Sequence, residues 1–356
     1  MNKTRQSDNK TTLAVMCRRV FAGILSLAII LTMLPMMSLK VSAASPTSVK
    51  IYGGNTVVEM VSSEEKVTYW KNRARQLGGS EADYNAKYDS DTNTLTLRNL
   101  DTKTIEGAAT SIYANGDLNI VLEGTNKIGQ LFRSGPSVAK GIYIEKGSLT
   151  ISGKGKLEII SEMLTNTNLA FDSIYVSKDI TIKGGAKVSI QAIKNQIDPG
   201  YAPDEHETLC AKNGNVTISG EDTVVSVDNI FGYAINAKDG QGQLIVADGA
   251  TVTAYGPPKM KVSSITTASG YQPRCAYGEN RMEVRTVTGS VPAEASKNTY
   301  VRIAPQDTVD VRTLEQLKEA LNVSADDAST KINVLNDITV TEELTAANST
   351  GTTKAV

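Results

Sequence analysis

The stretch that decides the fold is "GIYIEKGSLTISGKGKLEI", residues 141–159, because looser versions of it recur along the chain. Four other segments align with it: "SIYANGDLNIVLEGTNKI" (111–128), "SIYVSKDITIKGGAKVSI" (173–190), "TLCAKNGNVTISGEDTVVSV" (208–227) and "YAINAKDGQGQLIVADGATVTAY" (233–255). Their leading apolar residues lie 30, 32, 35 and 26 residues apart and are Ile112, Ile142, Ile174, Leu209 and Ile235. Repeats of this length are typical of solenoids, propellers and arrays.

Each copy contains three short strand-like segments separated by polar or Gly-rich turns. Apolar residues alternate, as at Leu149 and Ile151 and again at Leu157 and Ile159, and Thr, Val and Ile are abundant. Helical periodicity is absent from this region. One coil cannot bury its apolar side alone, whereas stacked coils place the leading apolar residues on one another. The sequence therefore predicts an all-β fold, a parallel β-helix (solenoid) over residues 101–305.

One alternative fold stays open at this point. The segment "LTISGKGKLEI" by itself is also typical of a β-hairpin with a Gly turn, so an antiparallel sandwich would fit the same strands. The repeat length, and the first short strand in every copy, favour the solenoid.

The residues on either side of the repeats differ from them. "YDSDTNTLTLRNL" (88–100) resembles a degenerate coil, and we expect residues 44–100 to form an N-terminal cap and this first coil, because end coils face water. "NTYVRIAP" (298–305) predicts a closing strand. From residue 306, Leu314, Leu317 and Leu321 lie at helical spacing, and the strand-like "KINVLNDITV" follows. We expect residues 306–356 to open a second module, a short α/β segment, that is incomplete in this sequence.

The first 43 residues are typical of a secretory signal peptide. Basic residues precede an apolar run from Val20 to Leu39, which ends near the small residues Ser42 and Ala43. Removing residues 1–43 takes away six Lys/Arg and one Asp, which changes the formal charge from −1 to −6. We therefore expect a secreted, extracellular or cell-wall-associated protein that has no membrane span after processing. A mildly acidic chain is also a poor candidate for binding nucleic acid.

The repeats, together with the upstream "YWKN" and "YDSDTNTLTLRNL", resemble those of secreted bacterial carbohydrate-binding β-helix proteins. These are relatives in fold of pectate lyases and are common on Gram-positive bacteria. The tail "VRTLEQLKEALN" with "TKINVLNDITV" resembles the entry to another pectate-lyase-like module. The resemblance implies a right-handed β-helix that binds cell-wall or host polysaccharide, within a longer adhesin-like chain that carries further modules. In some relatives Asp-rich turns hold calcium, but the turns here, such as Glu145-Lys146-Gly147, lack paired aspartates.

Tyrosines occupy the second position of the first strand in three successive copies. If Ile112, Ile142 and Ile174 point inward, the alternation places Tyr113, Tyr143 and Tyr175 outward on adjacent coils. An exposed row of aromatic rings can stack on sugar faces, although such a row also stabilises a sheet through contacts between strands. Trp70, the only tryptophan, is a further carbohydrate-binding candidate, with sealing of the cap as its structural alternative.

Metal and disulfide candidates lie later in the chain. The insertion "NQIDPGYAPDEHET" gathers Asp198, Asp204, Glu205 and Glu207 around the only histidine, His206, and outside the cell such a loop could take calcium. The spacing matches no EF-hand or zinc motif, which favours a solvated acidic loop. Cys210 and Cys275 could form one disulfide in an oxidising compartment, if residues 256–297 fold back along the coils; two unpaired thiols are the alternative.

Motifs for catalysis are absent from the sequence. It contains no G-x-S-x-G, H-E-x-x-H or P-loop, and a single histidine cannot build a multi-histidine metal site. Glycoside hydrolysis needs only two carboxylates, so a polysaccharide lyase or hydrolase stays a lesser hypothesis. We expect a binding protein without a cofactor, for which calcium is the one candidate ion. The alternative is a rigid stalk that displays other modules.

Overall fold

The computed structural model describes residues 45–356 with gaps. The gaps are 54–55, 73, 106–109, 133–138, 164–170, 195–206, 231, 257–259, 269–270, 272, 280–284, 307, 312, 316, 319, 322–330, 335–337, 341–344, 348–352 and 356. The predicted signal peptide and residues 195–206 of the acidic insertion, with Asp198, Asp204, Glu205 and His206, therefore lie outside the described residues. Within the described part of the chain, no helix is long and apolar enough to cross a membrane.

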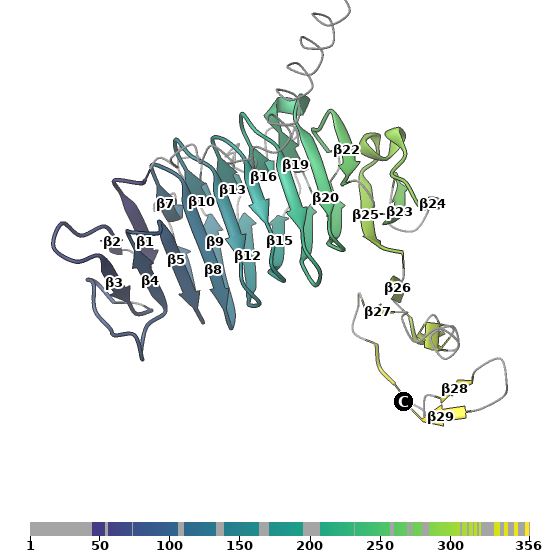
Figure 1. The fold of residues 1–356 in the computed structure, drawn as a ribbon, viewed down its shortest axis with the longest axis horizontal. Helices are drawn as coiled ribbons and strands as arrows, with labels where there is room; N and C mark the ends of the chain where they lie inside the picture. Colours follow the sequence, from purple (N-terminus) through teal and green to yellow (C-terminus); the bar gives the residue numbers. More distant parts are fainter. Residues whose placement is uncertain are drawn as a thin grey trace, which may run out of the picture. The chain divides into compact units, whose positions relative to one another are not determined.

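Most of the described residues before 306 lie in three β-sheets, whose strands follow one another round each coil (Figure 1). The first sheet contains β1 (Val49–Gly53), β2 (Thr56–Glu59), β7 (Thr110–Ala114), β10 (Ala139–Ile144), β13 (Phe171–Val176), β16 (Glu207–Ala211) and β19 (Tyr233–Ala237). The second contains β3 (Val67–Trp70), β4 (Ala86–Asp89), β5 (Thr94–Arg98), β8 (Leu118–Glu123), β11 (Leu149–Ser152), β14 (Ile180–Ile182), β17 (Val216–Ser219), β20 (Gln243–Ala247) and β22 (Ser264–Thr267). The third contains β6 (Asp101–Ile105), β9 (Thr125–Phe132), β12 (Lys156–Met163), β15 (Lys187–Lys194), β18 (Val224–Asn229), β21 (Thr251–Tyr255), β23 (Pro273–Gly278), β24 (Arg285–Thr288) and β25 (Tyr300–Pro305).

Strands of successive sequence copies pair in parallel. In the first sheet, Ile142 of β10 is the register partner of Ile112 in β7 on one side and of Ile174 in β13 on the other. The same holds in the second sheet, for example between β11 and β14, and in the third, between β12 and β15. The prediction of an all-β, solenoid-like fold is therefore confirmed, and the antiparallel sandwich is excluded for the repeats.

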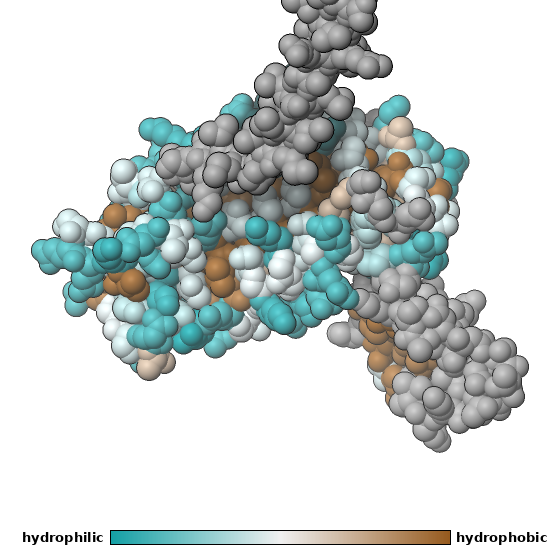
Figure 2. Space-filling view, in the orientation of Figure 1, coloured by the Kyte–Doolittle hydropathy of each residue, from teal (hydrophilic) through white to brown (hydrophobic). Residues whose placement is uncertain are grey.

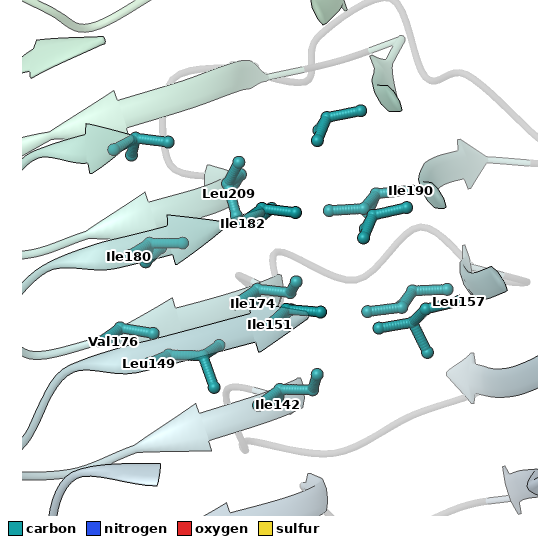
Figure 3. Close-up of a cluster of buried hydrophobic side chains, with 14 of the residues drawn as sticks. Ile142, Leu149, Ile151, Leu157, Ile174, Val176, Ile180, Ile182, Ile190 and Leu209 are labelled. Carbon is teal, nitrogen blue, oxygen red and sulfur yellow. The ribbon is translucent and has the colours of Figure 1, made fainter. Parts of the chain in front are cut away.

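The interior of the stack is filled by the alternating apolar residues of the repeats. Figure 3 shows Ile142 and Ile174 of the first sheet near Ile151 of the second and Leu157 of the third. Each of these side chains is completely buried. Burial of an Ile or Leu side chain contributes about 1.5–3 kcal/mol, so stacking of the coils supplies the stability that no coil has by itself.

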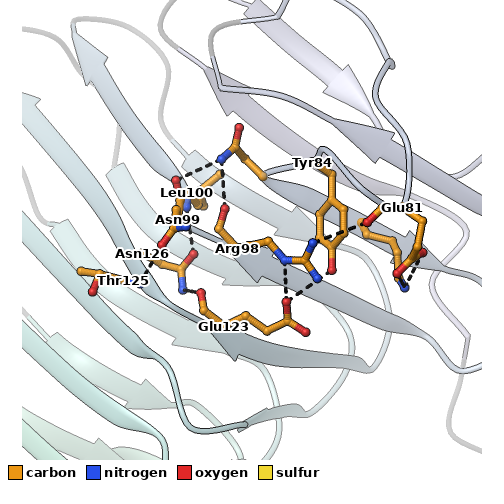
Figure 4. A network of polar contacts seen from close by, with 10 residues as sticks. Glu81, Tyr84, Arg98, Asn99, Leu100, Glu123, Thr125 and Asn126 are labelled. Atoms are coloured by element: carbon orange, nitrogen blue, oxygen red, sulfur yellow. Dashed lines mark hydrogen bonds and ion pairs between the residues drawn. The ribbon is translucent and has the colours of Figure 1, made fainter.

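Polar side chains bridge the coils where the second sheet turns into the third. The Asn126 side-chain oxygen accepts the Leu100 N–H at 2.9 Å, and its amide donates to the carbonyl oxygens of Glu123 and Lys156, both at 3.1 Å. Asn99 accepts the Thr125 N–H at 3.1 Å in the same network (Figure 4). Asn126 is fully buried, so these bonds satisfy backbone groups that water cannot reach.

The parallel ladders end in antiparallel strands on both sides. Toward the N-terminus, β1 pairs antiparallel with β7, and β3, β4 and β5 form an antiparallel set before β5 joins β8 in parallel. Toward the C-terminus, β25 pairs antiparallel with β21 and with β23. The closing strand predicted at 298–305 is therefore present as β25.

Residues 306–356 are described in part. β26 (Thr308–Val311) pairs in parallel with β27 (Lys331–Val334), and β28 (Thr345–Ala347) pairs antiparallel with β29 (Thr353–Ala355). Near the predicted helix, the N–H of Leu317 donates to the carbonyl oxygen of Thr313 at 3.0 Å, the spacing of an α-helical turn.

Candidate binding surface on the first sheet

The three predicted tyrosines lie side by side on the outer face of the first sheet. Tyr143 is the register partner of Tyr113 and of Tyr175, and all three side chains are partly exposed. The ring centroids are 5.6 Å apart between Tyr113 and Tyr143 and 5.7 Å apart between Tyr143 and Tyr175. The rings meet edge to face, a favoured arrangement for aromatic pairs. The row is thus a line of tilted rings, which leaves a ridged rather than a flat aromatic surface.

A lysine is packed between two of the rings. The Lys140 ammonium lies 3.8 Å from the ring centroids of both Tyr143 and Tyr175. Burial lowers the pKa of Lys140 from its ordinary value, while Asp172 nearby raises it. At the other end of the row, the Tyr113 hydroxyl donates to the Glu145 carboxylate. The rings are therefore held in fixed positions, as a preorganised binding surface requires.

The row continues past the tyrosines into a polar network. Cys210 is the register partner of Tyr175, and Asn236 is the partner of Cys210. The Cys210 thiol donates to the Glu207 carboxylate at 2.9 Å, and the Asn236 amide donates to the other oxygen of that carboxylate. Lys261 completes the network with an ion pair to Glu207 at 3.5 Å. Here the outer face is polar and closely packed.

Asp172 is a buried carboxyl group between the tyrosines and this network. Its side chain is 6% exposed, and it is the register partner of Lys140. Burial, with the charge of Glu207 adding to its effect, raises the pKa of Asp172 to about 7, whereas Lys140 acts in the opposite direction. Burial likewise raises the pKa of the Cys210 thiol, with Glu207 adding to the effect. Both groups are therefore largely protonated below neutral pH.

Trp70 corrects the sequence-based expectation. Its side chain is completely buried in β3, and the indole N–H donates to the Ala74 carbonyl at 3.0 Å. A buried indole cannot stack on a sugar, so the assignment of Trp70 to carbohydrate binding is wrong. The alternation along β3 explains this, because Thr68 and Trp70 face inward while Val67 and Tyr69 do not.

The predicted disulfide is also wrong. Cys210 and Cys275 are both free and fully buried. Cys210 lies in β16 of the first sheet, whereas Cys275 lies in β23 of the third sheet, opposite Ile303 of β25. Residues 273–278 do fold back against the coils, as the pairing required, but onto a different sheet.

Metal binding is not supported among the described residues, where no group of three or more His, Cys, Asp or Glu side chains could hold an ion. The candidates Asp198, Asp204 and Glu205 lie outside the described residues.

Sequence reasoning missed Lys140 and Asp172, and it noted Glu207 only as part of the acidic insertion. They stand in one aligned column, three residues before the Tyr113 column, and this column reads Thr110, Lys140, Asp172, Glu207 and Tyr233. Three ionisable residues in one column between Thr and Tyr were the available signal. The burial of Asp172, which raises its pKa, could not be read from the column.

The coloured surface in Figure 2 is mainly hydrophilic, with smaller hydrophobic patches, as expected if the apolar residues face inward. A search for similar proteins found no significant match among protein families, curated proteins or solved structures.

Proposed function

We propose that this protein binds polysaccharide on the outer face of its first sheet, at the row formed by Tyr113, Tyr143 and Tyr175. The observation that carries the proposal is the register of these three residues, which holds three partly exposed rings in one line on adjacent coils. A sugar presents an apolar face and a hydroxyl rim, and a tyrosine presents an apolar ring and a hydroxyl group. A row of such rings along the stack suits a chain of sugars better than a single sugar.

The proposal extends to the setting of the protein. We infer secretion through a signal peptide at residues 1–43, and a right-handed coil whose N-terminal antiparallel strands act as a cap, as in the bacterial β-helix family that the sequence resembles. Secretion is supported by the basic, apolar and small-residue segments of the leader. The cap is supported by antiparallel strands at the start of the stack.

The test compares the wild-type full chain with two variants on a glycan array and on insoluble polysaccharides. In one variant all three tyrosines are replaced by Ala, and in the other by Phe. We expect the Ala variant to bind about tenfold more weakly or worse, corresponding to ~1.4 kcal/mol per tenfold. The Phe variant should keep most of the affinity, because it keeps the rings. Tyr255→Ala, in the third sheet, is the matched control.

Circular dichroism and thermal unfolding show whether each variant keeps the fold. A folded Ala variant that binds glycan as well as the wild type does would refute the tyrosine row as the site. Failure of the wild type to bind any glycan, with calcium or with chelator, would favour a second function, that of a rigid stalk. The continuous parallel register of the repeats in all three sheets is the observation that favours the stalk.

A further inference from the structure

The outer face of the third sheet carries a hollow of about 240 Å³. Side chains from three neighbouring strands surround it in two rows. One row consists of Lys156, Lys187 and Val224, and the other consists of Glu158, Ser189 and Ser226. The hollow exists because two short serines stand beside longer side chains on adjacent strands.

The two lysines are register partners on adjacent parallel strands, β12 and β15. Such strands are ~4.8 Å apart, and like charges directly opposite each other destabilise a sheet. The other residues next to them in this row, Thr125 and Val224, carry no charge. Among the described residues, neither Lys156 nor Lys187 forms an ion pair. Two adjacent, exposed ammonium groups at the rim of a hollow are an arrangement that an anion would stabilise.

The second row supplies polar side chains that can form hydrogen bonds with the hydroxyl groups of a ligand. Ser189 and Ser226 line the hollow, while the Glu158 carboxylate lies 3.9 Å from the Lys127 ammonium on the side away from Ser189. Two residues beyond Glu158 on the same strand, Ile160 is 40% exposed. Ammonium, hydroxyl and apolar groups therefore lie close together on this face.

We propose that this face is a second binding surface, for a saccharide that carries anionic groups such as carboxylate or sulfate. The hollow is smaller than the ~300–1,000 Å³ of typical small-molecule sites, which suits one charged sugar unit of a longer chain. Glu158 at the edge of the hollow disfavours a densely charged phosphodiester polymer. This inference does not depend on the tyrosine row, which belongs to another sheet.

The test measures binding of the full chain to hyaluronate, to dextran sulfate and to neutral dextran by calorimetry, at low and at physiological ionic strength. The variant Lys156→Gln/Lys187→Gln should bind the preferred anionic polymer about tenfold more weakly and with a smaller dependence on salt. The matched control is Lys146→Gln/Lys178→Gln, two exposed lysines in the turns after β10 and β13, which should bind like the wild type.

A third variant, Ser189→Tyr, keeps both lysines but fills the hollow, and it should lose binding as well. The two polymers distinguish carboxylate from sulfate as the recognised group. The proposal is overturned if the wild type binds neither hyaluronate nor dextran sulfate, or if the two double-lysine variants lose affinity equally. Tighter binding of an oligonucleotide than of either polymer would also overturn it. Binding that is lost in the tyrosine variant and unchanged in Lys156→Gln/Lys187→Gln would also overturn it, while leaving the first surface in place.

Discussion

At the scale of single residues, Asp172 is the group whose surroundings have the clearest consequence for stability. In the folded chain its pKa lies at about 7, mainly because of burial, while an unfolded Asp titrates near its ordinary value of 3.8. At a pH between these two pKa values, the Asp172 carboxyl group is protonated in the folded state and deprotonated in the unfolded state. Stability contributed by this group is therefore complete below pH ~4 and falls as the pH rises towards 7.

We predict that Asp172→Asn removes this part of the pH dependence. The wild-type free energy of unfolding should fall between pH 5 and pH 7 by up to about 1.4 kcal/mol per pH unit more than that of the variant. Urea denaturation of both proteins at several pH values measures this. The exposed Asp222→Asn should behave like the wild type. Parallel pH profiles for the wild type and Asp172→Asn would show that Asp172 titrates normally.

Asn126 carries a second prediction at this scale. Replacement by Ala leaves the buried Leu100 N–H without its acceptor at 2.9 Å and removes two donated bonds. We expect Asn126→Ala to lower the free energy of unfolding by about 2–3 kcal/mol. Asn119→Ala, at an exposed position, is the control for denaturant melts. Equal unfolding midpoints for the two variants would contradict the structural role of Asn126.

At the scale of elements, the turns are where neighbouring coils come closest. A Cβ on Gly147 would lie 2.4 Å from the backbone of Gly116 and from the Asp117 nitrogen in the preceding coil. We predict that Gly147→Ala destabilises the protein by about 2–3 kcal/mol, because backbone must move to accept it. Gly78→Ala, where no atom lies within 4 Å, should change stability by less than ~1 kcal/mol. Thermal unfolding compares them, and a Gly147→Ala melt that matches Gly78→Ala would contradict tight contact of the turns.

The sequence predicted the strands and their register more completely than it predicted the orientation and contacts of individual side chains. Alignment of the copies placed Ile112, Ile142 and Ile174 in register and inward, since a stack requires the same residue types at the same depth in every coil. The same alignment predicted the tyrosine row. For Trp70 it gave no guide, because β3 lies outside the aligned copies and alternation alone does not tell which of two neighbours, Tyr69 or Trp70, faces the core.

Features that depend on more than one column of the alignment could not be predicted. The hollow beside Ser189 needs the lengths of side chains on three strands and the space between them. The raised pKa of Asp172 depends on its burial. Distance along the chain likewise did not reveal that Cys210 and Cys275 belong to different sheets.

At the scale of the whole molecule, the free thiols give a prediction for the purified protein. After unfolding without reductant, every cysteine in the chain should react with a thiol reagent. In the native state Cys210 and Cys275 should react slowly, because both are buried and burial raises the pKa of each thiol. A reductant should leave the unfolding temperature unchanged. If two cysteines of the unfolded protein failed to react with the reagent, a disulfide between Cys210 and Cys275 would be supported after all.

The parallel register between successive coils has a consequence for how the number of coils can change in evolution. A segment from one leading isoleucine to the next, such as residues 142–173, begins and ends at equivalent positions of the stack. A duplication or deletion of that segment in the gene would add or remove one full coil and join matching strands on either side. Length can therefore vary by unequal recombination, in whole coils, while the two ends stay intact and the tyrosine and lysine rows grow or shrink by one residue.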